Sequence, residues 1–224
     1  MPHLDPPEPV AMDRVHTVVK AAVSAVPYVG GPAAELFGAI VPTSLERRRQ
    51  EWFKRVADRL RRLEEQDVHI DADDEGFITI VVEATKAALG THIEEKLELL
   101  ANCVESAALP EQRDDFMAMR LLLYVEELSP EHFVVLTYAA DPEGWFDGKG
   151  LAKPTFTMGS SRHVLDAAQL DVQGDVLEIV LRDLADRGLA DTLRGGTMTA
   201  HGAWQPLTTD LGRLLLKFVQ LMDD

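Results

Sequence analysis

The fold is decided by residues 175–188, whose sequence is DVLEIVLRDLADRG. Four aliphatic side chains in it recur at intervals of three and four residues: Leu177, Val180, Leu181 and Leu184. This spacing places side chains on one face of an α-helix. Gly188 follows where a helix often ends in a left-handed residue, a conformation that glycine adopts most easily. The stretch therefore predicts a helix over residues 175–187 with one apolar face and a defined end.

A two-stranded ribbon and a closing helix are predicted after this glycine. Residues 189–192 and 204–207 would form the strands, joined by a glycine-rich loop around Arg194. Thr208 or Thr209 then offers a side-chain oxygen that can cap the next helix. The apolar face of that helix consists of Leu211, Leu214, Leu215, Phe218 and Met222.

Helix, ribbon and helix in this order resemble a winged-helix domain. The residues that carry the resemblance are Leu181, Leu184, Arg187-Gly188-Leu189, Leu207-Thr208 and Gly212-Arg213-Leu214-Leu215. They are similar to a pattern at the end of bacterial winged-helix regulators: leucine, basic residue, glycine, leucine, ribbon, leucine and threonine, glycine. The resemblance covers residues 129–222 and implies helices with a small β-ribbon. A fold alone does not define a function.

Length and composition favour a globular protein. The 224 residues are enough for one large domain or two small ones, and 46% of them are hydrophobic. The single cysteine, Cys103, excludes an internal disulfide framework and a cysteine-based zinc site, which fits a cytoplasmic location. Residues 1–12 have no basic region ahead of an apolar core, so we expect an extended arm there and no secretory signal.

The net charge of −16 is distributed unevenly. Residues 1–62 hold ten basic and seven acidic side chains, whereas residues 63–224 hold twelve basic and thirty-one acidic ones. An acidic surface repels phosphate backbones, because nucleic-acid affinity depends mainly on contacts between cations and phosphates. Any nucleic-acid binding would therefore come from a local basic patch.

The most apolar window of the chain is residues 21–45, which hold a single charged side chain. We expect a helix over residues 13–26 and a second, short helix over residues 33–41 that ends before Pro42. Two interpretations remain open: residues 15–42 are a hairpin that inserts into or lies on a membrane, or they are a closely packed helix pair. Each arm is shorter than the roughly 20 apolar residues that a spanning helix needs, which favours the helix pair.

A strong helix is predicted over residues 45–66, begun by Thr43 or Ser44. Its basic face is a candidate surface for nucleic acid or anionic lipid. The residues of this possible interaction surface are Arg47, Arg48, Arg49, Lys54, Arg55, Arg59, Arg62 and Trp52. Acidic side chains are interleaved with the basic ones, which favours the alternative: a solvated helix with internal ion pairs, or a helix that docks on the acidic remainder.

Residues 66–76 form an acidic break after this helix. Four of them match the first half of a calcium loop: Asp71, Asp73, Glu75 and Gly76. Val82 stands where the second half needs a bidentate glutamate, so we predict no metal there. The β-branched residues 77–82 could instead form a short strand.

Further helices are predicted over residues 91–108 and 114–128. The tetrad Thr91-His92-Ile93-Glu94 matches a capping box at the start of the first of them. Ser129-Pro130-Glu131 is typical of the start of another helix. Residues 141–159 are expected to be a loop.

Motifs for catalysis are absent from the sequence: no Gly-x-Ser-x-Gly elbow, no phosphate loop and no His-Glu-x-x-His pair. Ser160, His163 and Asp166 lie three residues apart, which on one helix makes them neighbours and favours a capped helix start over a catalytic triad. His92 and Glu95 could supply two metal ligands, but nothing nearby supplies a third. We therefore predict neither enzymatic activity nor a cofactor.

The outward face of helix 175–187 would enter a major groove if the domain bound DNA. Groove-reading helices are usually rich in side chains that donate hydrogen bonds to phosphates and bases, whereas this one is mainly acidic. The candidate surface residues of the helix and the wing are Asp175, Glu178, Arg182, Asp186, Arg187 and Arg194. Their charges favour contact with a protein partner or with a second copy of the chain.

The sequence thus predicts a mainly α-helical protein: an extended arm (residues 1–12), a helical region (13–128) and a winged-helix-like domain (129–224). Residues 26–32 and 48–53, VPYVGGP and RRQEWF, are also similar to a group of bacterial proteins of no known activity.

The leading functional hypothesis is a non-enzymatic regulatory or protein-interaction module. Two alternatives remain open. One is a DNA-binding transcriptional regulator, in which the basic helix compensates for the acidic one. The other is a membrane-active bacterial effector that uses residues 15–42.

Overall fold

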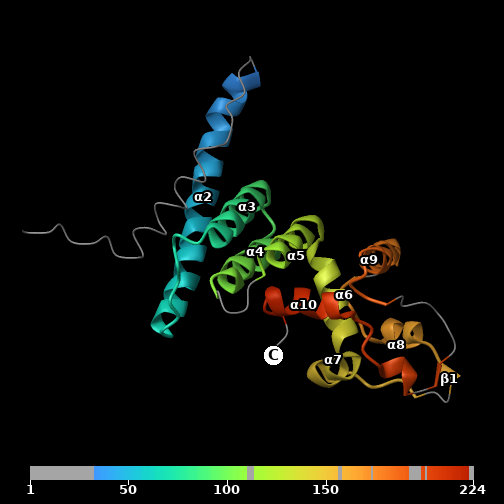
Figure 1. The fold of residues 1–224 in the computed structure, drawn as a ribbon. Coiled ribbons are helices and arrows are strands. Elements are labelled where there is room, and N and C mark those ends of the chain that lie inside the picture. Colours follow the sequence, from blue (N-terminus) through green and yellow to red (C-terminus); the bar gives the residue numbers. More distant parts are fainter. Residues whose placement is uncertain are drawn as a thin grey trace, which may run out of the picture. The chain divides into compact units, whose positions relative to one another are not determined.

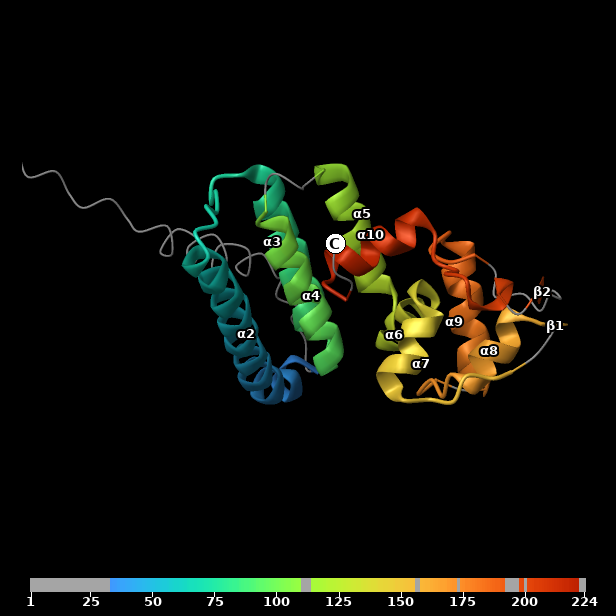
Figure 2. The same ribbon diagram turned by 90° about the horizontal axis from the view of Figure 1, so that it is seen from below.

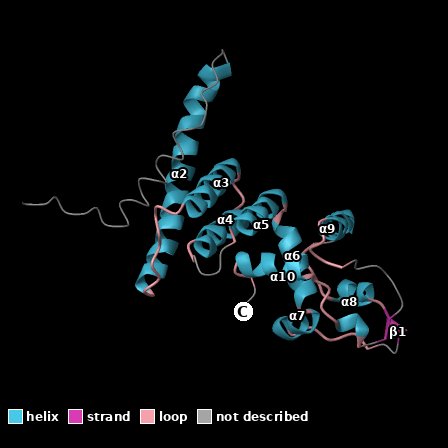
Figure 3. Cartoon of the chain, in the orientation of Figure 1, coloured by secondary structure: helices cyan, strands magenta, loops and turns pink. Residues whose placement is uncertain are grey.

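The computed structural model describes residues 33–109, 114–155, 158–172, 174–191, 198–199 and 201–221, with side chains from Leu45 onward except at 158–159 and 198–199. This part of the chain is mainly helical (Figures 1 and 3). The chain divides into two compact units, residues 1–126 and 127–224. Each unit is described by itself below.

The first unit is a bundle of helices. It contains α2 (Ala33–Glu65), α3 (Glu75–Gly90), α4 (Glu94–Ala107) and α5, which spans Asp115–Glu127. The helices α2, α3 and α4 lie against one another (Figure 2). Their shared core contains Val56, Leu60, Ile80, Val81, Ala84, Leu100 and Val104. Nζ of Lys96 in α4 donates to the carbonyl of Glu126, 3.0 Å away, and so caps the end of α5.

The expected break at Pro42 is wrong, because α2 runs without interruption from Ala33 to Glu65. Proline removes one backbone hydrogen bond and usually ends or kinks a helix. Here the segment that follows is rich in leucine, glutamate and arginine, which favour helix and carry it across this position. The helix predicted over residues 13–26 lies outside the described residues.

The acidic break leads into a helix and not into a calcium loop or a strand. Oδ1 of Asp74 accepts a hydrogen bond from the amide of Phe77 at 2.8 Å and caps α3, which begins at Glu75. Phe77, Ile80 and Val81 are buried at helical spacing. The strand considered as an alternative over residues 77–82 does not form, since side-chain capping and the three- to four-residue apolar period outweigh β-branched composition.

The capping box predicted at residues 91–94 is also wrong. Thr91 is the residue that ends α3, and its Oγ1 accepts a hydrogen bond from the amide of Ile93 at 3.2 Å. The next helix, α4, begins at Glu94 after Ile93, whose side chain cannot cap it. The threonine thus stabilises the short turn between the two helices.

The second unit is also mainly helical. Its elements are α6 (Pro130–Ala140), α7 (Pro142–Lys149), β1 (Met158–Gly159), α8 (Ser161–Ala167), α9 (Gly174–Asp186), β2 (Met198–Thr199), the 3-10 helix η2 (Gly202–Trp204) and α10 (Asp210–Phe218). The loop expected over residues 141–159 is wrong in its first half. Asp141 caps α7 by accepting from the amide of Gly144 at 2.9 Å, and Phe146 is fully buried.

A close contact joins the end of α9 to the start of α10. Gly188 has a φ of 66°, and the amide of Leu189 donates to the carbonyl of Leu184 at 2.9 Å, as expected for a helix that ends in a left-handed residue. The hydroxyl of Thr209 donates to the carbonyl of Gly188 at 2.6 Å. A Cβ on Gly212 would overlap the carbonyl oxygen of Leu189. The glycine is therefore needed for the two backbones to approach.

The strands of this unit differ from the predicted ribbon. The short strands β1 and β2 pair antiparallel, with Met158 opposite Thr199. Where residues 189–192 and 204–207 are predicted to pair, the described residues show one isolated bridge, between Ala190 and Thr208. A two-stranded wing is therefore not shown, and the loop around Arg194 lies outside the described residues.

Candidate interaction surfaces

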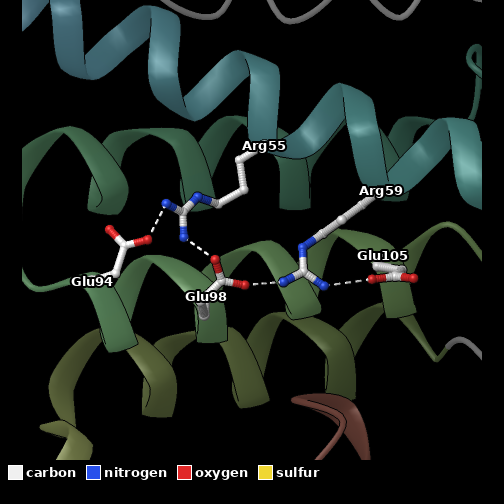
Figure 4. Close-up of polar contacts among 5 residues, drawn as sticks. All are labelled: Arg55, Arg59, Glu94, Glu98 and Glu105. Carbon is white, nitrogen blue, oxygen red and sulfur yellow. Dashed lines mark hydrogen bonds and ion pairs between the residues drawn. The ribbon is translucent and has the colours of Figure 1, made fainter.

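Two arginines of the predicted basic surface face α4 and form a ladder of ion pairs (Figure 4). Arg55 contacts Glu94 and Glu98, and Arg59 contacts Glu98 and Glu105, the last at 2.8 Å. The side chains of Arg59 and Glu105 are each only 13% exposed. The ladder joins α2 to α4, so these two arginines contribute to packing within the unit.

The other basic residues of the predicted surface form ion pairs within α2, or none among the described residues. Arg47 pairs with Glu51 within the helix at 3.7 Å, and Arg49 pairs with Glu46 at 3.5 Å. Three predicted surface residues are exposed and form no ion pair among the described residues: Arg48, Lys54 and Arg62. The basic surface that is available to a ligand is therefore much smaller than the sequence suggests.

Trp52 is not part of any surface, which corrects its place in the predicted set. Its side chain is 2% exposed, and Nε1 donates to Oγ1 of Thr85 in α3 at 3.0 Å. The indole therefore fixes α2 to α3. Trp52 also belongs to the apolar stripe of α2, and it is this periodicity that decides its position.

The outward face of α9 has a different composition from the face of α2. Leu177, Val180 and Leu184 are buried, as the spacing predicts. Beside this buried stripe, Val176 and Ile179 are 52% and 54% exposed. These apolar side chains lie one helical turn apart among exposed charges, and the sequence pattern does not single them out because charged residues dominate the polar side of this helix.

The charges on one flank of α9 are held by neighbouring elements of the unit. Arg187 lies 3.7 Å from Asp183 and 3.5 Å from Glu127. Nε2 of His132 in α6 is 3.4 Å from Asp183. On the other flank, Arg162 of α8 pairs with Glu178. The contacts of His132 and Arg162 thus link α9 to α6 and α8.

His132 occupies a defined protonation state in this arrangement. Its Nδ1 accepts a hydrogen bond from the amide of Ser129 at 3.2 Å, so the ring proton is on Nε2, toward Asp183. Burial lowers the pKa of His132, and the attraction of Asp183 opposes this effect only in part. The folded unit therefore favours the neutral imidazole of His132. Sequence reasoning missed this residue because its partner is 51 positions away.

Two opposite charges of α9 have no ion-pair partner among the described residues of the unit. Asp175 and Arg182 are exposed and form no ion pair with any residue that the structure describes. They are seven residues apart, which is about two helical turns, and so lie on the same edge of the face. Asp186 is likewise exposed.

The residues considered for catalysis have structural roles. Ser160 caps α8 by accepting from the amide of His163 at 3.3 Å, and Asp166 pairs with Arg162 at 2.8 Å. The thiol of Cys103 is fully buried, and burial raises its pKa. The expected helix cap at Ser160 is confirmed.

No group of three or more histidine, cysteine or carboxylate side chains suited to a metal occurs among the described residues. None of the helices in this part of the chain is long and apolar enough to cross a membrane. The segment 15–42 falls largely outside it. No protein-family model, curated protein or solved structure matches the chain.

Proposed function

We propose that the chain is a non-enzymatic protein-interaction module of regulatory type, and that its contact surface is the outward face of α9. The observation that carries the proposal is the exposure of Val176 and Ile179, which lie between the buried stripe of α9 and its charged side. Exposed aliphatic pairs with a charged surround are typical of contacts between proteins, where an apolar centre is buried inside a polar rim.

The charges of the same face support a protein partner over DNA. Asp175, Glu178 and Asp186 are exposed there, and Arg162 already neutralises Glu178. A helix that reads a major groove needs donors for phosphates and base edges, and carboxylates repel both phosphates and many base acceptors. Arg182 is the one exposed base of the helix itself, which is too little for groove binding.

The basic helix offers limited compensation for a DNA-binding function. Arg55 and Arg59 are engaged with the glutamates of α4, and separating them would leave part-buried carboxylates without partners. Arg48, Lys54 and Arg62 remain for a phosphate surface. The affinity for DNA and its dependence on salt both increase with the number of phosphates that basic side chains contact. Three such residues therefore predict weak and nonspecific binding at most.

We further propose that the second unit is winged-helix-like. In its favour, the order of α6, β1, α8, α9 and β2 follows that fold, and the residues of the resemblance meet at the contact between α9 and α10. The isolated bridge between Ala190 and Thr208 lies where the base of a wing would start.

The proposal is tested by capturing partners on the purified full chain from an extract of the cells that make it. Ile179→Glu places a charge on this face, and Phe116→Glu is the matched control, since Phe116 is a 77% exposed side chain of α5. We expect the same proteins to be captured by the wild type and the control and to be lost from Ile179→Glu.

A parallel measurement addresses the two alternatives. Binding to duplex DNA and to anionic liposomes is followed across a salt titration. DNA binding that falls steeply with salt and is unchanged in Ile179→Glu would overturn the proposal in favour of a regulator. Liposome binding that is lost on deletion of residues 15–32 would favour the membrane-active effector.

A further inference from the structure

The outward face of α9 is complementary to itself. Val176 and Ile179 lie three residues apart and are both about half exposed, while Asp175 and Arg182 lie on one edge of the same face. These four positions fit a single heptad, with the apolar pair at its two seam positions and the charged pair, seven residues apart, beside it. The next two seam positions are Asp183 and Asp186, so the apolar seam is limited to this one heptad. Each helix thus offers one acid and one base on the same edge of an apolar seam.

The symmetry of such a pattern decides which arrangement satisfies it. In two antiparallel helices related by a two-fold axis, the same edge of each helix faces its counterpart. When Val176 lies against Ile179 of a second copy, Asp175 of each copy comes opposite Arg182 of the other. The two-fold axis then produces two contacts between Val176 and Ile179 and two ion pairs between Asp175 and Arg182.

We propose that a second copy of this chain covers this face, with the two α9 helices antiparallel about a two-fold axis. This inference rests on the proposed function of the α9 face and names its partner. The charges support a copy of the chain over an unrelated protein, since the helix itself supplies both halves of each ion pair. Glu178 and Arg187 are held within the unit, by Arg162 and by Glu127 and Asp183. Asp186, in contrast, is exposed one turn after Arg182 and takes no part in the two proposed ion pairs.

The size of the contact predicts its strength. Stable protein interfaces bury about 1,600 Å² in total, and two half-exposed aliphatic side chains per copy supply only a small part of that area. The association is therefore weak and depends on concentration. It is reversible and suited to a module that assembles when its local concentration rises.

The test measures self-association of the full chain by sedimentation velocity over a wide range of concentrations. Asp175→Lys makes both edge residues basic, and Arg182→Glu makes both acidic. Each variant turns two contacts between opposite charges into two contacts between like charges, so we expect self-association to weaken by about tenfold. Arg62→Glu is the matched control, an exposed arginine of α2 that should leave self-association unchanged.

Mixing the two variants gives the decisive result. When an Asp175→Lys copy meets an Arg182→Glu copy, the introduced lysine faces the introduced glutamate, and the remaining arginine faces the remaining aspartate. Both ion pairs therefore form again, one of them with its signs exchanged. We expect the equimolar mixture, and also the double variant Asp175→Lys/Arg182→Glu, to associate as the wild type does. Circular dichroism confirms that each variant is folded.

Two outcomes would overturn the inference. A wild-type chain that is monomeric at every concentration excludes a second copy as the partner, and capture of other proteins through Ile179 would then still support the proposed function. Self-association that neither single variant weakens, or that mixing does not restore, places the contact elsewhere on the chain. Loss of both self-association and capture would remove the proposed function as well.

Discussion

The helices α2 and α9 both mix acidic and basic side chains, yet particular charges of the two helices differ in whether a neighbouring helix pairs with them. In α2, Arg55 and Arg59 point at glutamates of α4 and join two helices of one unit. In α9, Asp175 and Arg182 point away from their unit and have no partner in the described structure. The comparison teaches that the role of a charge is set by the helix that packs beside it, and not by the charge pattern of its own helix.

The two units also differ in what holds their helices together. Both have ion pairs between elements, such as Arg59–Glu105 in the first and Arg162–Glu178 in the second, but the second also brings two backbones together at Gly212 and Leu189. Ion pairs weaken with salt, and close backbone contacts do not. A variant that disrupts the backbone contact should therefore have a larger effect than one that disrupts an ion pair.

The largest effect is expected from Gly212→Ala. The added Cβ overlaps the carbonyl oxygen of Leu189, a backbone atom that cannot rotate away, so α10 must shift and the second unit should lose about 3 kcal/mol of stability. Denaturant unfolding and hydrogen exchange in α9 and α10 measure the loss. Gly148→Ala is the control, because a Cβ at this position of α7 meets nothing within 4 Å. Equal stability of the two variants would refute the close contact.

The next effect is expected from Arg59→Ala, which removes the ladder's more buried arginine. Glu105 then remains 13% exposed without its partner, and we expect a loss of about 2 kcal/mol, reduced from a fully buried pair by the remaining exposure. Arg61→Ala, whose pair with Asp58 is about half exposed, should change stability much less. The rates of hydrogen exchange in α2 and α4 measure the difference in stability. Equal rates in the two variants would show that the ion pairs of Arg59 stabilise the unit no more than an exposed pair does.

A smaller effect concerns the pH dependence of the second unit. Burial lowers the pKa of His132 in the folded chain below the ordinary value of 6.5. As pH falls below that value, the unfolded chain takes up the proton first, so the stability contributed by the neutral imidazole is present above pH 6.5 and is lost as pH falls toward the folded pKa.

We expect this loss of stability to be smaller than that of Arg59→Ala and to be visible as faster hydrogen exchange in α6 and α9 at acidic pH. His132→Asn should remove this part of the pH dependence. The exposed His201 provides the control, His201→Asn, which should leave it unchanged. A pH profile that is the same in both variants would contradict the assigned state of His132.

The smallest effect is expected from Arg182→Ala. Because Arg182 has no ion pair among the described residues, the stability of the monomer should change by less than about 0.5 kcal/mol. Thermal unfolding at low protein concentration measures it. A loss as large as that of Arg59→Ala would show that α9 uses its charges as α2 does, and the comparison would fail.

Much of the helical fold follows from sequence patterns. The helix over residues 175–187, its end at Gly188 and the caps at Ser129, Ser160 and Thr209 are confirmed, since local periodicity and capping chemistry decide them. The element boundaries near Pro42, Thr91 and residues 141–159 are wrong, because weak local signals for a break compete there with helices that packing stabilises.

Faces are harder to predict than helices. On α10 Leu214 is expected on the inner face but is 41% exposed, and Leu216 is buried instead. A helix with apolar residues around most of its circumference has several possible inner faces, and only the neighbouring elements choose among them. For the same reason the basic surface is predicted too large, since the glutamates that pair with it come from another helix.

Cys103 gives the first unit a built-in reporter. It is the chain's single cysteine, it lies in the core with no exposed surface, and burial disfavours its thiolate. A thiol reagent can therefore modify the chain only while α4 is transiently open. The rate of that modification under native conditions therefore measures how often the first unit opens, without any introduced label. Opening of the second unit does not contribute to this rate.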